Sequence, residues 1–169
     1  MIVLETDRLN LRFLVAEDSA FVLELLNEPA WLQFIGDRNI RTLDGARTYI
    51  AKAVAMYERF GFGLYVVERK SDAEPLGLCG LIKRETLADV DIGFAFLARY
   101  WGNGYAYESA SAVVKYGRSA FDLPRIVAIT TSGNAASIRL LAKIGLHFEQ
   151  SIQLEDGGVT LSLYASGSS

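Results

Sequence analysis

The chain has 169 residues, of which 51% are hydrophobic and 22% are charged, and its formal net charge is −3. This composition excludes global disorder and suffices for one core, so we expect a single domain over residues 1–165 and a frayed tail at 166–169. The small negative charge argues against nonspecific nucleic-acid binding, and the single cysteine, Cys79, excludes an internal disulfide and a Cys/His zinc site.

The first dozen residues mix acidic and basic side chains, which is not the pattern of a secretory signal. No uncharged apolar run approaches the ~20 residues that a membrane-spanning helix needs. We therefore expect a cytoplasmic protein that uses neither a membrane nor a metal ion.

Hydrophobic periodicity predicts one strand and two helices in the first third of the chain. Residues 2–15 alternate between apolar and polar side chains as a strand does. Residues 16–27 have apolar side chains at helical spacing, and we expect Pro29 to end that helix. Residues 43–59 carry a longer apolar stripe, which Gly61 interrupts.

The rest of the chain alternates between strands and helices. The pattern predicts strands at 64–69, 76–83, 90–97 and 125–131, helices at 104–121 and 134–144, and a final hairpin over 146–154 and 159–164. The element order βααβββαβαββ indicates a mixed α/β fold in which an antiparallel meander runs into a βαβ unit.

A glycine-rich turn lies between the strand at 90–97 and the long helix. Gly102 and Gly104 precede the helix, where backbone N–H groups and the helix dipole favour a phosphate. Because glycine has no side chain, the main chain can approach such a group closely. The segment lacks the lysine of a P-loop and the third glycine of a dinucleotide fingerprint. An ordinary turn is the alternative to a phosphate site here.

A second polar feature follows the strand at 125–131. Asn134 is a good N-cap for the next helix, and Ser137 lies one turn later on the same face. A plain capped helix accounts for most of this segment, but ligands in open α/β sheets bind at strand ends. The polar pair is therefore a candidate binding site.

Together these stretches resemble the GNAT superfamily of N-acetyltransferases, and most closely its RimJ/RimL-like branch (ribosomal-protein-acetyltransferase-like). The most specific motifs are DIGF at 91–94, YWGNGYA at 100–106 and NxxSxxLxxKxG at 134–145. Gly104 and Ala106 match the later positions of the superfamily's Gln/Arg-x-x-Gly-x-Gly/Ala motif, and Trp101 at its first position looks like the RimL-like variant. The resemblance implies a central, mostly antiparallel sheet of about seven strands, flanked by helices, with a V-shaped splay between strands 4 and 5.

The resemblance also implies acetyl-CoA as a co-substrate, bound in that splay. The amides of residues 102–106 would hold the pyrophosphate, strand main-chain groups would pair with pantetheine as an added strand would, and Asn134 would bind the pantetheine arm. Arg99 is either a phosphate partner or an ordinary exposed arginine. The implied cofactor-binding residues are Phe94, Phe96, Leu97, Arg99, Trp101, Gly102, Asn103, Gly104, Tyr105, Ala106, Asn134 and Ser137.

The implied reaction is direct attack of a primary amine on the acetyl thioester in a ternary complex. Aliphatic amines have pKa values near ~10.4, so a base must assist at neutral pH. Asp91 occupies the position where the branch often has Glu. It is the candidate base and would act through water. The alternative is that Asp91 is an ordinary solvated carboxylate at the end of a strand. Glu85 is a weaker candidate. The amides of Phe96 and Leu97 would polarise the acetyl carbonyl.

The general acid is open. Many superfamily members have a tyrosine where this chain has Leu141, so Ser137 is the candidate proton donor, with Tyr105 and Tyr107 as alternatives. The missing tyrosine also keeps open a noncatalytic acyl-CoA-binding or sensing module of the same fold. A structural βαβ domain without a cofactor is the third alternative.

The acceptor is a protein N-terminus or a small amine such as a polyamine, an amino acid or an aminoglycoside, and the sequence does not choose among them. By resemblance, Trp31, Phe34 and the loop at 37–41 border the acceptor pocket, although a core role suits Trp31 equally. We expect His147 on the surface, Cys79 in the core, and a homodimer as the assembly.

Overall fold

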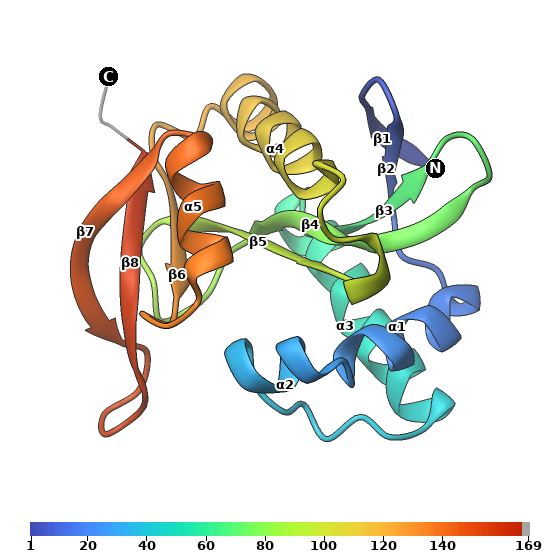
Figure 1. The fold of residues 1–169 in the computed structure, drawn as a ribbon, viewed down its shortest axis with the longest axis horizontal. Helices are drawn as coiled ribbons and strands as arrows, with labels where there is room; N and C mark the ends of the chain where they lie inside the picture. Colours follow the sequence, from blue (N-terminus) through green and yellow to red (C-terminus); the bar gives the residue numbers. More distant parts are fainter. Residues whose placement is uncertain (167–169) are drawn as a thin grey trace.

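The structure, a computed structural model, describes residues 1–166, which are built around one eight-stranded sheet (Figure 1). The strand order is β1-β2-β3-β4-β5-β6-β8-β7, and every neighbouring pair is antiparallel except β5 and β6. The strands are β1 (Ile2–Glu5), β2 (Leu9–Arg12), β3 (Leu64–Arg69), β4 (Glu74–Ile82), β5 (Val90–Phe96), β6 (Ile126–Thr130), β7 (Leu146–Gln153) and β8 (Thr160–Ser166).

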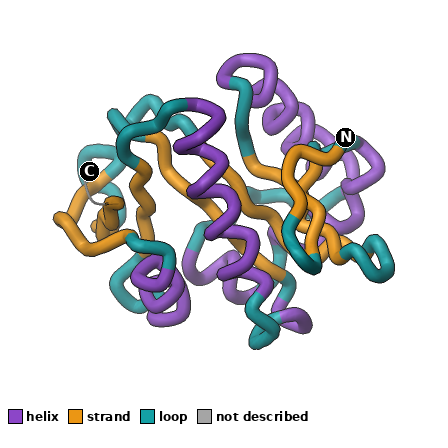
Figure 2. Tube along the Cα trace, turned by 90° about the horizontal axis from the view of Figure 1, so that it is seen from above, coloured by secondary structure: helices purple, strands orange, loops and turns teal. Residues whose placement is uncertain are grey.

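Helices cover both faces of the sheet. One face carries α1 to α3 and the other carries α4 and α5, with α4 lying across the strands when seen from above (Figures 1 and 2). The helices are α1 (Ser19–Leu26), α2 (Pro29–Phe34), α3 (Leu43–Phe60), α4 (Tyr105–Phe121) and α5 (Ala135–Lys143), and two 3₁₀ turns are η1 (Ala16–Asp18) and η2 (Ala98–Tyr100).

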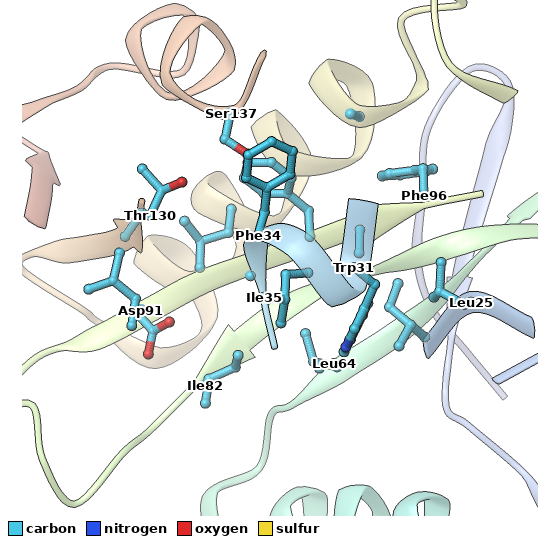
Figure 3. Close-up of a pocket in the computed structure, with 18 of the residues that line it drawn as sticks. Leu25, Trp31, Phe34, Ile35, Leu64, Ile82, Asp91, Phe96, Thr130 and Ser137 are labelled. Atoms are coloured by element: carbon cyan, nitrogen blue, oxygen red, sulfur yellow. The ribbon is translucent and has the colours of Figure 1, made fainter. Parts of the chain in front are cut away.

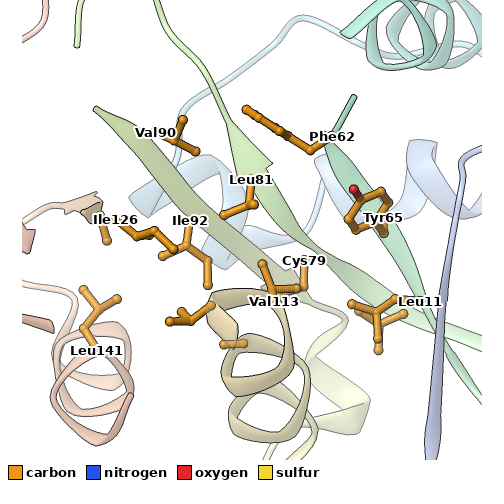
Figure 4. Packing of buried hydrophobic residues seen from close by; sticks show 14 of the residues in the cluster. Leu11, Phe62, Tyr65, Cys79, Leu81, Val90, Ile92, Val113, Ile126 and Leu141 are labelled. Carbon is orange, nitrogen blue, oxygen red and sulfur yellow. The ribbon is translucent and has the colours of Figure 1, made fainter. Parts of the chain in front are cut away.

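The alternation of side chains along the strands produces a separate core on each face. On β3, Tyr65 and Val67 are buried with Val113 of α4, whereas Val66 between them is buried with Leu25 of α1. Successive strand residues point to opposite faces, so an uninterrupted apolar run fits a strand covered on both sides. Figure 4 shows the α4 core, in which Val113 faces the side chains of β4 and β5.

Cys79 lies in this core and is completely buried. Burial raises the pKa of its thiol to about 12, because the thiolate loses its hydration. The thiol is therefore protonated at neutral pH, and the prediction that Cys79 is a small buried hydrophobe is confirmed.

The sheet opens between β5 and β6. These parallel strands pair at Val90 with Ile126 and at Asp91 with Val127, and no further pair follows although both strands continue within the described residues. The two strands diverge from there, as Figure 1 shows. The predicted V-shaped splay between strands 4 and 5 is confirmed, and these strands are β5 and β6 of the structure.

Three expectations about the chain's elements need correction. Residues 2–15 are two strands joined by a turn in which the Thr6 amide donates to the Leu9 carbonyl (2.9 Å), so the sheet has eight strands rather than seven. Pro29 ends no helix but begins α2, because the first helical position needs no N–H donor. Ser166 belongs to β8, where its hydroxyl accepts from the Ile126 amide (3.0 Å). The rest of the expected tail, 167–169, lies outside the described residues.

Candidate active site

A cavity of about 1520 Å³ lies where β5 and β6 part. It is lined by these strands and β4, by α2 and α3, by the first turn of α4 and by α5. Figure 3 shows Asp91, Thr130 and Ser137 around it, which come from β5, β6 and α5. The volume exceeds the ~300–1,000 Å³ typical of a pocket for one small molecule.

The turn before α4 presents a row of backbone N–H groups without partners. Gly102 and Gly104 have φ angles of 82° and 79°, a left-handed conformation that glycine adopts without steric cost. Within residues 1–166, no oxygen accepts a hydrogen bond from the amides of 102–107. A Cβ at Gly102 would meet nothing within 4 Å, so the space beside the turn is open. Consecutive free donors at a helix N-terminus suit an anion.

Side chains hold this turn in shape. Asn103 Nδ2 donates to the carbonyls of Tyr100 (3.0 Å) and Trp101 (3.3 Å). The indole N–H of Trp101 donates to the Phe96 carbonyl (2.9 Å), which fixes the turn against the end of β5. The amides of the turn are therefore preorganised by the protein itself.

The first turn of α4 is also tied to the hairpin of β1 and β2. Glu108 accepts from the Thr6 hydroxyl (2.6 Å), the Arg8 amide (3.1 Å) and Arg8 Nε (2.8 Å). The Arg8 guanidinium also stacks over the ring of Tyr105 at 4.6 Å. The Glu108 carboxylate stands near the positive end of the helix dipole, which adds to the stability of this junction.

The hydrogen bonds of β5 alternate, and this decides which of its main-chain groups face the splay. The Leu97 amide donates to the Leu76 carbonyl of β4 (3.0 Å). In an antiparallel ladder, opposite pairs alternate between bonded and unbonded, so the main-chain groups of Phe96 and Phe94 point away from β4 and towards the gap. The Phe96 carbonyl is taken by Trp101, whereas its amide is available to a ligand.

On the other side of the splay, α5 begins with Asn134. The Asn134 side-chain oxygen accepts from the Ser137 amide (3.3 Å), so the predicted N-cap is confirmed. The Asn134 side-chain NH₂ and the Ser137 hydroxyl both line the cavity side of α5 and make no hydrogen bond within the described part of the chain. Leu141 is buried in the core under the same helix.

Asp91 lines the cavity but is not solvated, since it is 1% exposed. Its Oδ1 lies 3.0 Å from Arg84 Nε. Burial raises the pKa of this carboxyl, and the positive charge of Arg84 partly opposes that rise. The reading of Asp91 as a solvated strand-end carboxylate is therefore wrong.

Comparison with known proteins identifies the family. A model of the acetyltransferase (GNAT) domain matches residues 8–147, which is more than half of the chain. The chain is a GNAT-family acetyltransferase. The predicted resemblance to this superfamily is confirmed.

Two relatives of this acetyltransferase come from Bacillus subtilis (strain 168). It is 33% identical over 153 residues to "Uncharacterized protein YkkB", covering 89% of this chain and 88% of that protein. It is 33% identical over 150 residues to "Uncharacterized N-acetyltransferase YoaA", covering 87% and 84%.

Solved structures share the fold of this acetyltransferase. The acetyltransferase from Agrobacterium tumefaciens str. C58 superposes with a TM-score of 0.85 at 21% identity, covering 99% of this chain and 95% of that chain. RimL, a ribosomal L7/L12 α-N-protein acetyltransferase in complex with coenzyme A, gives 0.83 at 20% identity, covering 98% and 97%. The predicted GNAT-like mixed α/β fold is thus confirmed, and it is shared with a ribosomal-protein acetyltransferase.

The structure brings most of the predicted site residues of this acetyltransferase together. Those lining the cavity are Asp91, Phe94, Phe96, Trp101, Gly102, Gly104, Tyr105, Ala106, Asn134 and Ser137. Tyr107 also lines it, whereas Glu85 is exposed outside it and His147 is exposed on β7. Phe34 borders the cavity, and Trp31 does so while being buried against α1.

Three predicted residues do not line the cavity. Leu97 is fully buried in the core under α1 to α3, and Asn103 is occupied in holding the glycine turn. Arg99 lies outside the cavity and forms an ion pair with Glu24 of α1. The structure therefore supports reading Arg99 as a structural arginine rather than as a phosphate partner.

The sequence reasoning missed a group of basic residues that line the cavity: Arg38, Lys52, Lys83, Arg84, Arg139 and Lys143. Apart from Lys143, which belongs to the motif at 134–145, no motif marks them, because they come from four separate segments of the chain. Among the helices of residues 1–166, none is both long and apolar enough to cross a bilayer. In the same residues, no three His, Cys, Asp or Glu side chains group together as metal ligands would.

Proposed function

We propose that this acetyltransferase moves an acetyl group from acetyl-CoA to a primary amine by direct attack in a ternary complex. GNAT-family enzymes use acetyl-CoA, and the fold is that of RimL, which has been seen with coenzyme A. The observation that carries the proposal is the parting of β5 from β6 beside the unpartnered amides that precede α4.

The residues present fit coenzyme A. The free amides of 102–106 and the open space beside Gly102 suit its pyrophosphate. The main-chain groups of Phe94 suit pantetheine as an added strand, with the Asn134 side chain across the gap. When bound there, the coenzyme supplies the acetyl thioester.

Asp91 is the proposed base. A raised pKa brings a carboxylate closer in basicity to the amine, and the place of Asp91 on the cavity wall would let it accept a proton through a chain of waters, since it lies five positions before Phe96 in β5. The Phe96 amide is the proposed donor to the acetyl carbonyl. The Leu97 amide is not, because it is bound to Leu76. The Ser137 hydroxyl is the proposed proton donor to the departing sulfur.

Release of free thiol from acetyl-CoA in the presence of a panel of primary amines tests the proposal. A thermal shift with acetyl-CoA alone tests binding separately, and mass action predicts ~2.7 kcal/mol of stabilisation at a hundredfold excess over the dissociation constant. A shift without thiol release on any amine would favour the noncatalytic module. The absence of any shift would contradict the proposed coenzyme site.

A further inference from the structure

Basic side chains gather in the part of the cavity that faces α3, which we call the acceptor half. They are Arg38 in the loop between α2 and α3, Lys52 in α3, and Lys83 and Arg84 directly after β4. Among described residues, Asp91 is the one acidic side chain lining this half. Such an excess of positive charge is unexpected in a chain with a net charge of −3.

The other acidic side chains that line the cavity do not balance this charge. Glu28 precedes α2 and accepts a hydrogen bond from the Ala98 amide (3.3 Å), at the far end of β5 from Asp91. Glu155 belongs to the exposed turn between β7 and β8. Neither forms an ion pair with a basic residue of the acceptor half in residues 1–166.

Two of the four basic side chains form neither an ion pair nor a hydrogen bond within residues 1–166. Lys83 donates to the carbonyls of Arg84 (2.8 Å) and Leu87 (2.5 Å), and Arg84 pairs with Asp91. Arg38 and Lys52, in contrast, form no ion pair with any described residue. Their charges face the cavity unneutralised.

Nearby arginines that do not line the cavity behave differently. Arg41 pairs with Asp37 at 2.7 Å, and Arg47 pairs with Asp44 at 2.7 Å. Acidic partners are thus present in the same loop and helix, but they are paired with the outward-facing arginines. Between residues 37 and 52, the two basic side chains without an ion pair are thus the two that line the cavity, Arg38 and Lys52.

Tyr49 of α3 adds a phenolic hydroxyl to the same half of the cavity. Burial raises the pKa of this phenol, and the positive charges of Arg38 and Arg84, which line the cavity as well, oppose the rise. The Tyr49 hydroxyl makes no hydrogen bond within residues 1–166 and stays available as a donor.

We propose that the acceptor carries an anionic group, a carboxylate or a phosphate, close to its primary amine, and that Arg38, Lys52 and Tyr49 bind this group. The inference rests on the proposed function, because it assigns the acceptor for the same reaction. Guanidinium and ammonium donors match the oxygens of a carboxylate or phosphate. Polyamines and aminoglycosides are disfavoured, since their positive charges are repelled by Arg38 and Lys52.

The apolar lining adds a second preference. Phe34, Ile35 and Met56 line the same half, and Figure 3 shows Phe34 and Ile35 beside the strands. An acceptor that carries an apolar group beside its amine, as an apolar amino acid does, is therefore favoured.

Matched acceptors that differ in one charge test this inference. Phenylalanine and phenylalaninamide share the ring, but the carboxylate raises the pKa of the amine, so rates are compared per unprotonated amine. On that basis we expect kcat/KM to be about 10- to 100-fold higher for the acid, the worth of one or two charge-assisted hydrogen bonds. Phosphoethanolamine against ethanolamine distinguishes phosphate from carboxylate, and spermidine represents the cationic amines. Arg38→Gln and Lys52→Gln should each lower the acid-to-amide ratio, whereas Arg47→Gln, a paired arginine outside the cavity, should leave it unchanged.

Equal use of the acid and the amide, or spermidine as the best acceptor, would overturn the inference. Thiol release from none of these amines would count against the proposed function instead. In that case a thermal shift still decides the inference, because N-acetylphenylalanine must stabilise the protein more than N-acetylphenylalaninamide, and Arg38→Gln must remove the difference. Equal shifts by the two compounds would refute it.

Discussion

Replacing Gly104 with glutamate tests the coenzyme site most directly. Gly104 is the N-cap of α4 at a φ of 79°, so any side chain there costs about 1–2 kcal/mol in backbone strain. The new carboxylate would lie at the positive end of the helix dipole, and this interaction should stabilise the variant by about 0.3–1 kcal/mol. The nearest side chain is Arg8, whose Nε is bound to Glu108 and whose Nη2 would lie 3.4 Å from the new Cβ, so its remaining N–H groups can offset part of the added charge. The fold should therefore survive with a small loss of stability.

Coenzyme binding should not survive. The glutamate places bulk and negative charge among the amides that would hold the pyrophosphate. In a chain of this size, ~2.7 kcal/mol of ligand stabilisation corresponds to a rise in Tm of roughly 5–10 °C at a hundredfold excess of acetyl-CoA. Differential scanning fluorimetry should show this rise for the wild type and none for Gly104→Glu.

Gly104→Gln is the matched control, because it has the same backbone strain and nearly the same volume without the charge. The two variants should melt at similar temperatures without ligand, and the glutamine variant should keep more of the acetyl-CoA shift than the glutamate variant. A full shift in Gly104→Glu would show that the coenzyme binds elsewhere and would refute the assignment of this turn.

Three further predictions follow from buried groups. Asp91→Asn should lower kcat by about 10²–10⁴-fold. In the wild type, kcat/KM should be lost at low pH as the Asp91 carboxylate takes up a proton. Because burial raises the pKa of Asp91, this loss should occur at a pH above the usual aspartate range. Arg84→Gln removes a charge that lowers this pKa, so the acidic limb should move to higher pH, and a limb that stays in place would argue against Asp91 as the base. Cys79 should resist a thiol reagent at pH 8 until the protein unfolds, and rapid labelling of the native protein would contradict its burial. Gly80→Ala should destabilise by about 3 kcal/mol in urea unfolding, since its Cβ would lie 2.0 Å from the Gly63 carbonyl oxygen, and a change within 0.5 kcal/mol would show that the strands can separate there.

The features that the sequence predicted correctly are those with short-range causes. The strand at 64–69 has the predicted bounds because its β-branched and aromatic residues lie between turn residues. The helix at 43–59 matches α3 to within one residue, because Thr42 caps its start and Gly61 at a φ of 82° ends it. The glycine turn and the Asn134 cap are equally local, which is why they could be recognised before the fold was known.

The features that the sequence could not reveal depend on partners far along the chain. Arg99 has the right position in sequence to bind a phosphate, but its ion pair with Glu24 joins residues 75 positions apart. Asp91 stands where a strand begins and looks solvated, yet β6 and Arg84 cover it. The basic residues of the acceptor half are scattered between Arg38 and Arg84, and nothing in their spacing shows that they meet.

The two residue pairs that join β5 to β6 give the middle of this sheet an unusual property. Beyond Asp91, the amides of Phe94 and Phe96 pair with no neighbouring strand, although β5 lies between β4 and β6 in the sheet. Deuterium should enter there as quickly as at an outer strand, while the amide of Leu97, one residue away and bound to β4, stays protected. The centre of the sheet thus has unpaired main-chain groups of the kind that proteins usually confine to edge strands and cover or otherwise protect.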